Sequence, residues 1–180
     1  MIAQLKSNAV EAFDQLIERY GDRLYWHIRR VVVQHEEAED ALQETFTRAF
    51  LSIKDFRGEN EGSLIAWLYR IATTLAIRAL RRRKRGIFSS IDSVRGDLLA
   101  TFEHEVDPSA DEIIIRLQKA VLALPTKQRL VFNMRYYDEL SFEQISQITG
   151  DKVSTLKTNY HYAVQKVKES VSVIEIGEEI

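Results

Sequence analysis

Residues 36–85 read EEAEDALQETFTRAFLSIKDFRGENEGSLIAWLYRIATTLAIRALRRRKR, and this stretch decides the fold. Apolar residues recur in it at intervals of three and four, which is the spacing of one face of an α-helix. Gly58 and Gly62 interrupt this spacing and divide the stretch into two blocks. Because glycine and polar residues between periodic blocks are typical of a turn, the pattern predicts two amphipathic helices joined by a turn.

The first block is predicted to be a helix over residues 36–55 with an apolar and an acidic face. Its predicted buried stripe contains Ala41, Leu42, Thr45, Phe46, Ala49, Phe50 and Ile53. The residues predicted to face outward are Glu39, Asp40, Gln43, Glu44 and Arg48. An acidic face of this kind is either a solvated surface or a docking site for a basic partner.

The second block is predicted to be a helix that begins after Gly62, with Ser63 as its N-cap. Its predicted inner face contains Leu64, Trp67, Leu68, Ile71, Leu75 and Leu80. Six of the eight residues from Arg78 to Arg85 are Lys or Arg. Such a basic run suits a phosphate backbone, although it could also simply complement the helix dipole.

The rest of the chain predicts an all-α protein of two small helical domains joined by a flexible linker. Upstream, apolar residues between positions 8 and 32 predict one long helix or two short ones interrupted near Gly21. The helical period is lost over residues 87–110, where glycine, serine and acidic residues cluster, so this segment is predicted to be the linker. The predicted domains are therefore residues 1–86 and 111–180, the second broken at Pro125.

The second domain contains a predicted helix-turn-helix. Ser141 and Gln144 have the spacing of a capping box that opens a short helix, and Gly150 lies in the turn that follows. Ser154 is predicted to cap the next helix, whose packed face carries Leu156, Tyr160, Ala163 and Val167. The opposite polar face has the size to enter a major groove, but helix pairs joined through glycine also occur in proteins that never bind DNA.

Composition excludes several classes of site. The chain of 180 residues has no cysteine, which excludes disulfides and thiolate metal sites and is typical of a reducing cytoplasm. Its four histidines lack metal-ligand spacing, and no nucleophile-base pair, paired carboxylates or phosphate-binding glycine loop is present. No run of about 18 apolar residues or charged leader occurs, so we expect a cytoplasmic protein without membrane insertion, catalytic residues, metal or cofactor.

Taken in order, these motifs resemble the extracytoplasmic-function (ECF) subgroup of bacterial sigma factors in the sigma-70 family. Region two of that family is similar to AF at 12–13, YGDRLY at 20–25, AEDALQETF at 38–46, FRG at 56–58 and WLYRIA at 67–72. Region four is similar to LP at 124–125, QR at 128–129, VF at 131–132, YY at 136–137, LS at 140–141 and VSTLK at 153–157. The resemblance covers nearly the whole chain.

The resemblance implies that two parts of the chain bind core RNA polymerase. An acidic face, formed by Glu39, Asp40, Gln43 and Glu44, would dock on the clamp coiled coil of the largest polymerase subunit. The apolar helices that precede the helix-turn-helix would meet the polymerase flap.

The resemblance also implies that the first domain binds the promoter's minus-ten element as a single strand. The candidate residues are Phe56, Asn60, Ser63, Trp67 and Arg70, although Trp67 could equally be a core residue. A base stacked on an aromatic side chain contributes ~1–3 kcal/mol. The duplex upstream would contact Arg78, Arg81, Arg82, Arg83, Lys84 and Arg85 without its bases being read.

The helix after the turn would read the minus-thirty-five element. Its candidate contacts are Ser154, Thr155, Lys157, Thr158, Asn159, His161, Tyr162 and Lys166. Many relatives have arginine where this chain has Asn159 and Tyr162, so a bidentate arginine-guanine contact is absent at those positions. We therefore do not carry over the promoter preference of those relatives.

The predicted function is that of a non-enzymatic initiation factor that binds polymerase, recognises both promoter elements and helps to melt the duplex. An anti-sigma factor is a further partner that the resemblance implies. Two alternatives remain at this point: a sigma mimic that only sequesters an anti-sigma factor, and a conventional helix-turn-helix regulator. The intact basic run argues against the mimic, and polymerase-independent duplex binding would identify the regulator.

Overall fold

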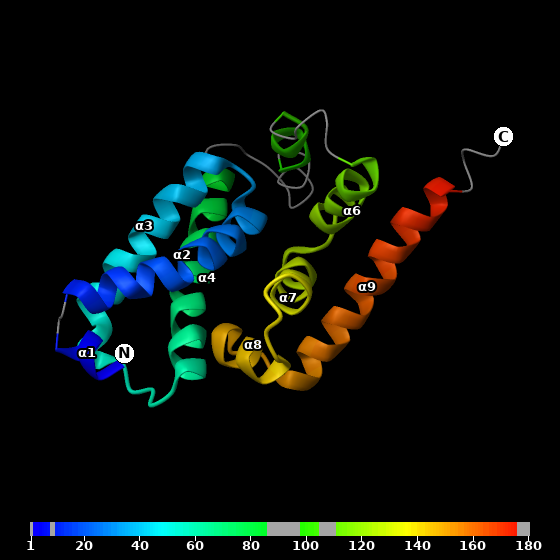
Figure 1. Cartoon of the computed structure of the whole chain (residues 1–180). Helices are drawn as coiled ribbons and strands as arrows, with labels where there is room; N and C mark the ends of the chain where they lie inside the picture. The colour runs from blue at the N-terminus through cyan, green and yellow to red at the C-terminus, as the bar shows by residue number, and fades with distance from the viewer. Residues whose placement is uncertain (1, 8–9, 86–97, 105–110, 176–180) are drawn as a thin grey trace.

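The computed structural model describes residues 2–7, 10–85, 98–104 and 111–175, and every regular element in these ranges is a helix (Figure 1). The predicted all-α class is confirmed. The elements are α1 (Ile2–Lys6), α2 (Val10–Val32), α3 (His35–Ser52), η1 (Ile53–Asp55), α4 (Glu61–Arg85), α6 (Glu112–Leu122), α7 (Thr126–Tyr136), α8 (Phe142–Thr149) and α9 (Val153–Glu175).

The N-terminal half is built on α2, α3 and α4, which pack against one another. Helix α2 runs through Gly21 without a break, so the chain chooses one long helix over two short ones. Its buried face carries Leu16, Leu24 and Ile28, each at 0% exposure. Burial of this apolar stripe outweighs the lower helix propensity of a single glycine, which is about 1 kcal/mol.

Helix α4 begins at Glu61, three residues earlier than predicted, and its N-cap is Asn60 instead of Ser63. The Asn60 Oδ1 accepts the backbone N–H of Ser63 at 2.9 Å, and the Ser63 Oγ accepts the backbone N–H of Asn60 at 3.3 Å. This pair has the reciprocal geometry of a capping box, with Ser63 in the third helical position. Both Ser and Asn are good N-caps, and the sequence pattern alone selected the wrong one.

The helix-turn-helix is formed by α8 and α9, as the sequence predicts. The capping box of Ser141 and Gln144 is present, and Gly150 ends α8 in the left-handed conformation at φ 79°. A residue with a Cβ would be strained there, which is why glycine suits this turn. Helix α9 already begins at Val153, so Ser154 lies inside its first turn and the prediction that it caps the helix is wrong.

Part of the predicted linker is helical. Residues 98–104 form a helix, and Leu98 within it is buried in the main core. Glu103 of this helix forms an ion pair with Lys119 of α6, with 2.8 Å between the Lys119 Nζ and the Glu103 Oε1. The sequence prediction missed this helix because glycine and acidic residues surround it. Its short apolar pattern has helical spacing and consists of Leu98, Leu99 and Phe102. The remaining linker residues, 87–97 and 105–110, lie outside the described ranges.

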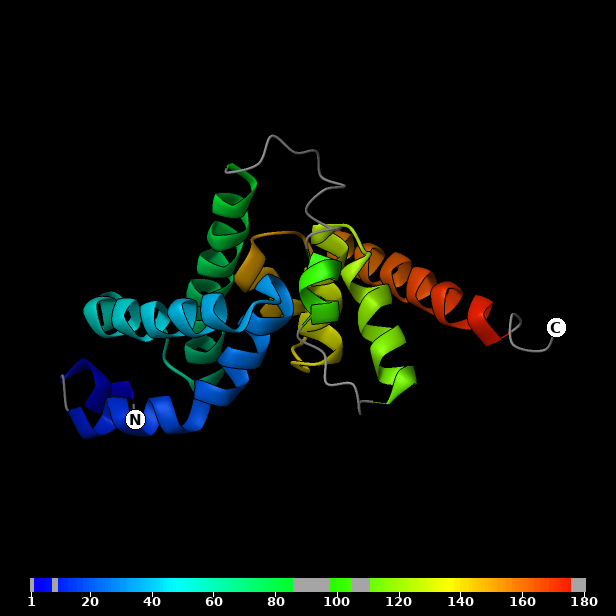
Figure 2. The ribbon, with the colours of Figure 1, turned by 90° about the horizontal axis from the view of Figure 1, so that it is seen from above.

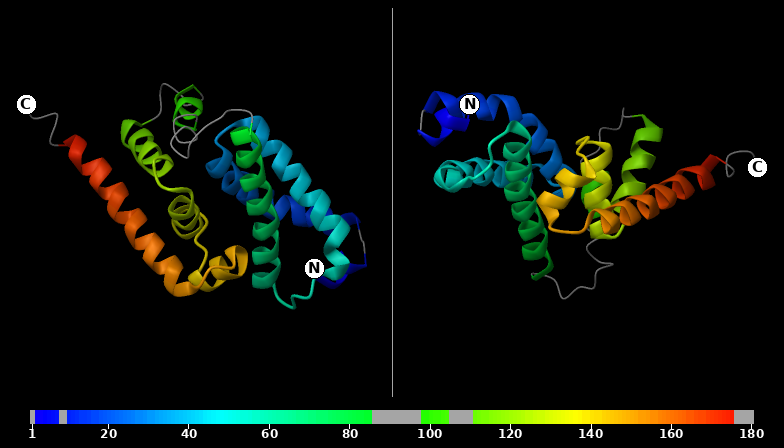
Figure 3. Two further views of the ribbon diagram at one scale, coloured as in Figure 1. Left: turned by 180° about the vertical axis from the view of Figure 1, so that it is seen from behind. Right: turned by 90° about the horizontal axis from the view of Figure 1, so that it is seen from below.

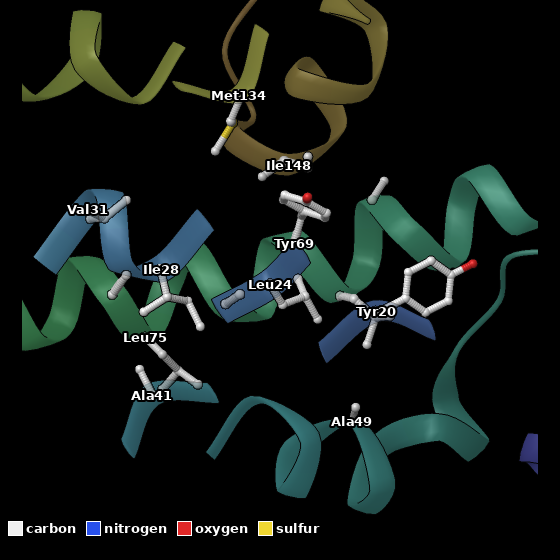
Figure 4. Packing of buried hydrophobic residues seen from close by; sticks show 14 of the residues in the cluster. Tyr20, Leu24, Ile28, Val31, Ala41, Ala49, Tyr69, Leu75, Met134 and Ile148 are labelled. Atoms are coloured by element: carbon white, nitrogen blue, oxygen red, sulfur yellow. The ribbon is translucent and has the colours of Figure 1, made fainter. Parts of the chain in front are cut away.

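The two halves share one hydrophobic core. Helix α8 packs on α4, and α7 contacts α2 and α8 (Figures 2 and 3). In Figure 4, Met134 of α7 and Ile148 of α8 lie against Tyr69 of α4 and near Val31 of α2. A smaller cluster between α6, α7 and α9 includes Val121, Leu124, Phe132, Ala163 and Val167. We call this arrangement, with α7 and α8 against α2 and α4, the closed contact.

The segment from Glu61 to Arg82 of α4 is long and apolar enough to span a membrane by length and composition. In this fold it is a core helix, because 56% of that window is buried inside the protein. It contacts α2, α3 and α8, which accounts for its apolar character without a bilayer.

Candidate polymerase and nucleic-acid interfaces

The acidic face lies on the outer side of α3, where the sequence places it. Glu39, Asp40 and Gln43 are exposed and Glu44 is half-buried. Two of the carboxylates already have partners on the same helix, because His35 pairs with Glu39 at 3.2 Å and Arg48 pairs with Glu44 at 2.5 Å. Asp40 makes no hydrogen bond or ion pair with any residue in the described ranges, so it is the carboxylate most available to a basic partner.

An apolar groove that sequence reasoning missed runs beside the acidic face, between α2 and α3. It measures about 1110 Å³, and its walls include Phe13, Ile17, Leu42, Phe46 and Phe50. Phe50 was predicted to be buried, but it is 41% exposed, and Ile17 across the groove is 44% exposed. The apolar faces of α2 and α3 are wider than the area in which the two helices contact each other. This surplus of apolar residues is the sequence feature that could have predicted the groove.

The predicted minus-ten loop is tightly organised. Phe56 is buried, with its ring centroid 5.0 Å from that of Trp67, so it supports Trp67 in this conformation instead of offering a free stacking surface. Asn60 and Ser63 are engaged in capping α4. Their roles in DNA binding remain predictions, and an incoming base would meet Trp67 before it met Phe56.

A second groove, of about 560 Å³, lies between α3 and α4. Trp67 and Ile71 are half-buried in it, and Arg48, Arg70 and Thr74 also line it. An aromatic ring beside an exposed arginine is suited to a nucleotide, since the ring stacks on a base and the Arg70 guanidinium attracts phosphate, whereas Arg48 is already paired with Glu44. The sequence identified Trp67 and Arg70 here, but Arg48 appeared only as a solvent-facing residue of the first block.

The groove continues into a stripe of exposed arginines along the same face of α4. Arg70, Arg78, Arg81 and Arg82 are all exposed, and their spacing keeps them within one side of the helix. We call these four residues the basic stripe. The side chains of Arg83, Lys84 and Arg85 lie outside the described part of the structure, although their backbone continues α4.

The loop makes one prediction about stability. A Cβ added at Gly58 would overlap the Phe56 ring and the Ser63 Oγ, whereas one added at Gly62 would meet only the Asn60 Oδ1, at 3.4 Å. Gly58→Ala is therefore expected to destabilise the protein by about 1–3 kcal/mol. Gly62→Ala, inside the first turn of α4, is expected to stabilise it by about 0.5–1 kcal/mol. Thermal unfolding of the two variants checks this difference in sign, and equal effects would contradict the described loop.

Helix α9 lies at the outer edge of the molecule (Figure 3), and its predicted polar face is largely exposed. The exposed residues are Ser154, Thr155, Lys157, Thr158, His161, Tyr162 and Lys166. Asn159 is half-buried, and Lys166 Nζ donates to the Gln128 Oε1 at 3.1 Å. Leu156 and Ala163 are fully buried on the opposite side, so the predicted division of the helix into two faces agrees with the structure.

Two family models match the chain: Sigma-70 region 2 over residues 16–86, and Sigma-70, region 4 over residues 114–167. Together they cover more than half of the chain and coincide with its two halves. The chain is an ECF sigma factor of the sigma-70 family. It is a transcription initiation factor, and this family is not a class of enzymes.

Relatives and solved structures agree with this assignment. The sigma factor is 30% identical to the ECF RNA polymerase sigma factor SigW of Bacillus subtilis (strain 168), over 94% of each chain. It is 26% identical to the ECF RNA polymerase sigma-E factor of Haemophilus influenzae, over 95% of this chain and 93% of that one.

Its fold is similar to that of CnrH in complex with the cytosolic domain of CnrY, with a TM-score of 0.70 and 22% identity over 96% of this chain and 95% of that one. It is also similar to the sigma factor RpoE in complex with the anti-sigma factor NepR from Bartonella quintana, with a TM-score of 0.69 and 20% identity over 91% and 98% of the two chains.

The closed contact of the sigma factor contains a buried polar cluster that sequence reasoning did not predict. His27 of α2 and Asp138, in the turn after α7, are 0% and 5% exposed. The His27 Nδ1 donates to the Asp138 Oδ2 at 2.7 Å, and the His27 Nε2 lies 2.9 Å from the Thr73 Oγ1 of α4. Arg30 donates to the other Asp138 oxygen at 3.1 Å. We call His27, Arg30, Thr73 and Asp138 the latch.

A second buried charge in the closed contact lacks such partners. Arg129 of α7 is 1% exposed, and its only side-chain hydrogen bond within the described ranges is a long one of 3.4 Å from Nη2 to the Val31 carbonyl of α2. Its Nε and Nη1 have no hydrogen-bond partner among the residues that the structure describes. Burial lowers the pKa of Arg129 to about 10, because the charged guanidinium has lost its water.

No group of three or more His, Cys, Asp or Glu residues in the described ranges could hold a metal ion.

Proposed function

We propose that this sigma factor binds core RNA polymerase through its acidic face, reads the minus-ten element with α4 and the minus-thirty-five element with α9, and helps to melt the promoter. The observation that carries the proposal is the single face of α4 on which Trp67 and the basic stripe lie in line. An aromatic groove for single-stranded bases is thereby continuous with cations for duplex phosphates.

The arrangement suits promoter melting because the two kinds of contact need different forms of DNA. The basic stripe attracts any phosphate backbone, so it positions the factor without reading sequence. The groove at Trp67 accepts a base only after that base has left the duplex stack. Stacking of about 1–3 kcal/mol per base then offsets part of the cost of opening the duplex.

Polymerase docking is assigned to α3 and to the second half of the chain. Asp40 is an unpaired carboxylate, and Gln43 is exposed beside it. In the second half, Ile113 and Ile114 of α6 are exposed apolar side chains that suit an apolar flap surface. The partners act in the cytoplasm, where polymerase and promoter DNA are found.

An anti-sigma factor is the third proposed partner. Both solved structures with similar folds are complexes: CnrH with the cytosolic domain of CnrY, and the sigma factor RpoE with the anti-sigma factor NepR. The apolar groove between α2 and α3 borders the acidic face, so a helix seated there would also cover Glu39 and Gln43. An inhibitor bound in this way would compete directly with polymerase.

The test is run-off transcription with purified core polymerase on a promoter library, with the wild-type factor and an Asp40→Ala, Glu44→Ala double variant. Removal of two carboxylates from the acidic face is expected to lower initiation at limiting factor by about tenfold or more. The matched control, Glu11→Ala with Asp14→Ala, removes two exposed carboxylates from α2 and should leave initiation unchanged. Duplex binding without polymerase, together with no initiation, would instead identify a conventional regulator.

A further inference from the structure

We propose that the latch holds the free sigma factor in the closed contact and that the latch must open before the factor can read a promoter. The inference concerns regulation and rests on the proposed function. The latch joins α2 and α4 of the first half to the α7–α8 turn of the second half. It is therefore positioned to control the separation of the two DNA-reading modules.

The closed contact is too short to serve both promoter elements at once. Their names place them some 25 base pairs apart, which is on the order of 85 Å at ~3.4 Å per base pair. Helix α4, with 25 residues, is only about 38 Å long. Since α8 packs directly against α4, the helix-turn-helix lies next to the minus-ten module and must move away to reach its own element.

Four features make the latch a specific closure. The Asp138 carboxylate accepts from His27 with one oxygen and from Arg30 with the other. Arg23 donates to the Asp138 backbone carbonyl at 3.3 Å. The Arg30 guanidinium also lies 4.4 Å from the centre of the Tyr137 ring. Removal of one partner from such a buried set leaves the others desolvated and unpaired, which is costly in the closed state only.

Other features of the same contact oppose closure. Arg129 is buried there, and two of its nitrogens and the buried Asn133 Oδ1 have no hydrogen-bond partner in the described part of the chain. The closed contact therefore holds favourable and unfavourable terms together, as a reversible switch requires.

The experiment measures the distance between the halves in the free, full-length protein. Because the chain has no cysteine, Gln15→Cys on α2 and Glu169→Cys on α9 supply two unique labelling sites, both exposed. Single-molecule energy transfer between the labels then reports the closed and open populations. The doubly labelled protein is compared with four labelled variants: Asp138→Asn, Thr73→Val, Arg129→Met, and Asp138→Asn combined with Arg129→Met.

The wild type is expected to give one dominant short distance. Asp138→Asn should lower the closed-to-open ratio by on the order of tenfold to a hundredfold, and Thr73→Val, which lies in the other half, should lower it by several-fold. Arg129→Met removes an unpaired charge, so in the Asp138→Asn background it should restore the closed population. An unchanged distance in Asp138→Asn and Thr73→Val, with native circular dichroism, would overturn the latch.

Matched controls separate the latch from general charge effects. Asp14→Asn changes an exposed carboxylate on α2, and Lys127→Met changes an exposed cation on α7, two residues from Arg129. Neither should move the distance distribution. If either control opens the halves as far as Asp138→Asn does, the specific role of the latch is wrong.

Transcription distinguishes failure of the latch from failure of the proposed function. With unlabelled protein at limiting polymerase, Asp138→Asn should initiate faster than wild type. If the latch variants separate the two halves but neither they nor the wild type initiate transcription, the latch is supported and the proposed function is wrong. If the wild type initiates normally but the latch variants do not separate the halves, the proposed function is supported and the latch is wrong.

Discussion

Replacement of Arg78, Arg81 and Arg82 by alanine is expected to weaken binding of the polymerase-factor complex to promoter duplex on the order of several hundredfold at about 0.1 M salt. All three side chains are exposed on one face of α4. Each phosphate contact contributes about 0.9 to the slope of log affinity against log salt. Loss of three contacts should therefore make this slope shallower by about 2.7, and a salt titration of filter binding or anisotropy measures it.

The pattern of the loss distinguishes backbone contacts from base contacts. Because arginines that bind phosphate carry no sequence information, the triple variant should lose affinity almost equally for matched and scrambled promoters. Lys127→Ala, which removes an exposed cation from α7, is the control and should leave the slope unchanged. An unchanged slope in the triple variant would show that the basic stripe does not lie on the duplex.

Leu24→Ala is expected to destabilise the protein by about 3–5 kcal/mol. Leu24 is 0% exposed and lies between α2 and α4, close to Tyr69 (Figure 4). A buried leucine loses both its transfer free energy and the contacts around the cavity that remains. The free energy of unfolding of an ordinary domain is about 5–15 kcal/mol, so this loss is a large share of it.

Urea unfolding followed by circular dichroism measures this effect. Leu51→Ala is the control, because Leu51 is 75% exposed and its truncation should change the free energy of unfolding by less than about 0.5 kcal/mol. Since both halves contribute to one core, wild type should unfold in a single transition. Two separate transitions would mean that the halves are energetically independent.

Sequence reasoning found the local elements because their signals are local. The capping box at Ser141 and Gln144 and the turn at Gly150 are short-range patterns, and both were predicted correctly. The family assignment followed from motifs in order, and it is confirmed. At helix ends the prediction was less accurate, because Asn60 and Ser63 are equally good caps in isolation and only the backbone geometry separates them.

The closed contact could not be read from the sequence, because it joins residues far apart along the chain, and the latch pairs of Asp138 are more than a hundred positions apart. His27 looked like one of four histidines without metal-ligand spacing, and Asp138 was part of none of the predicted sites. Arg129 was noticed only as part of a family motif, and its burial reverses the usual preference of arginine for the surface. The sites on α3, α4 and α9 remain predictions about binding, although the faces that carry them are now located.

The shared core also has a consequence for synthesis of the protein. When the first 85 residues have left the ribosome, the side of Tyr69 that Met134 and Ile148 later cover still faces water. At ~5–20 residues per second, the covering residues follow only after about 3–12 seconds. A nascent chain or a fragment that stops near residue 85 therefore exposes an apolar surface to chaperones and proteases, and the sigma factor becomes fully protected only when its second half has been made.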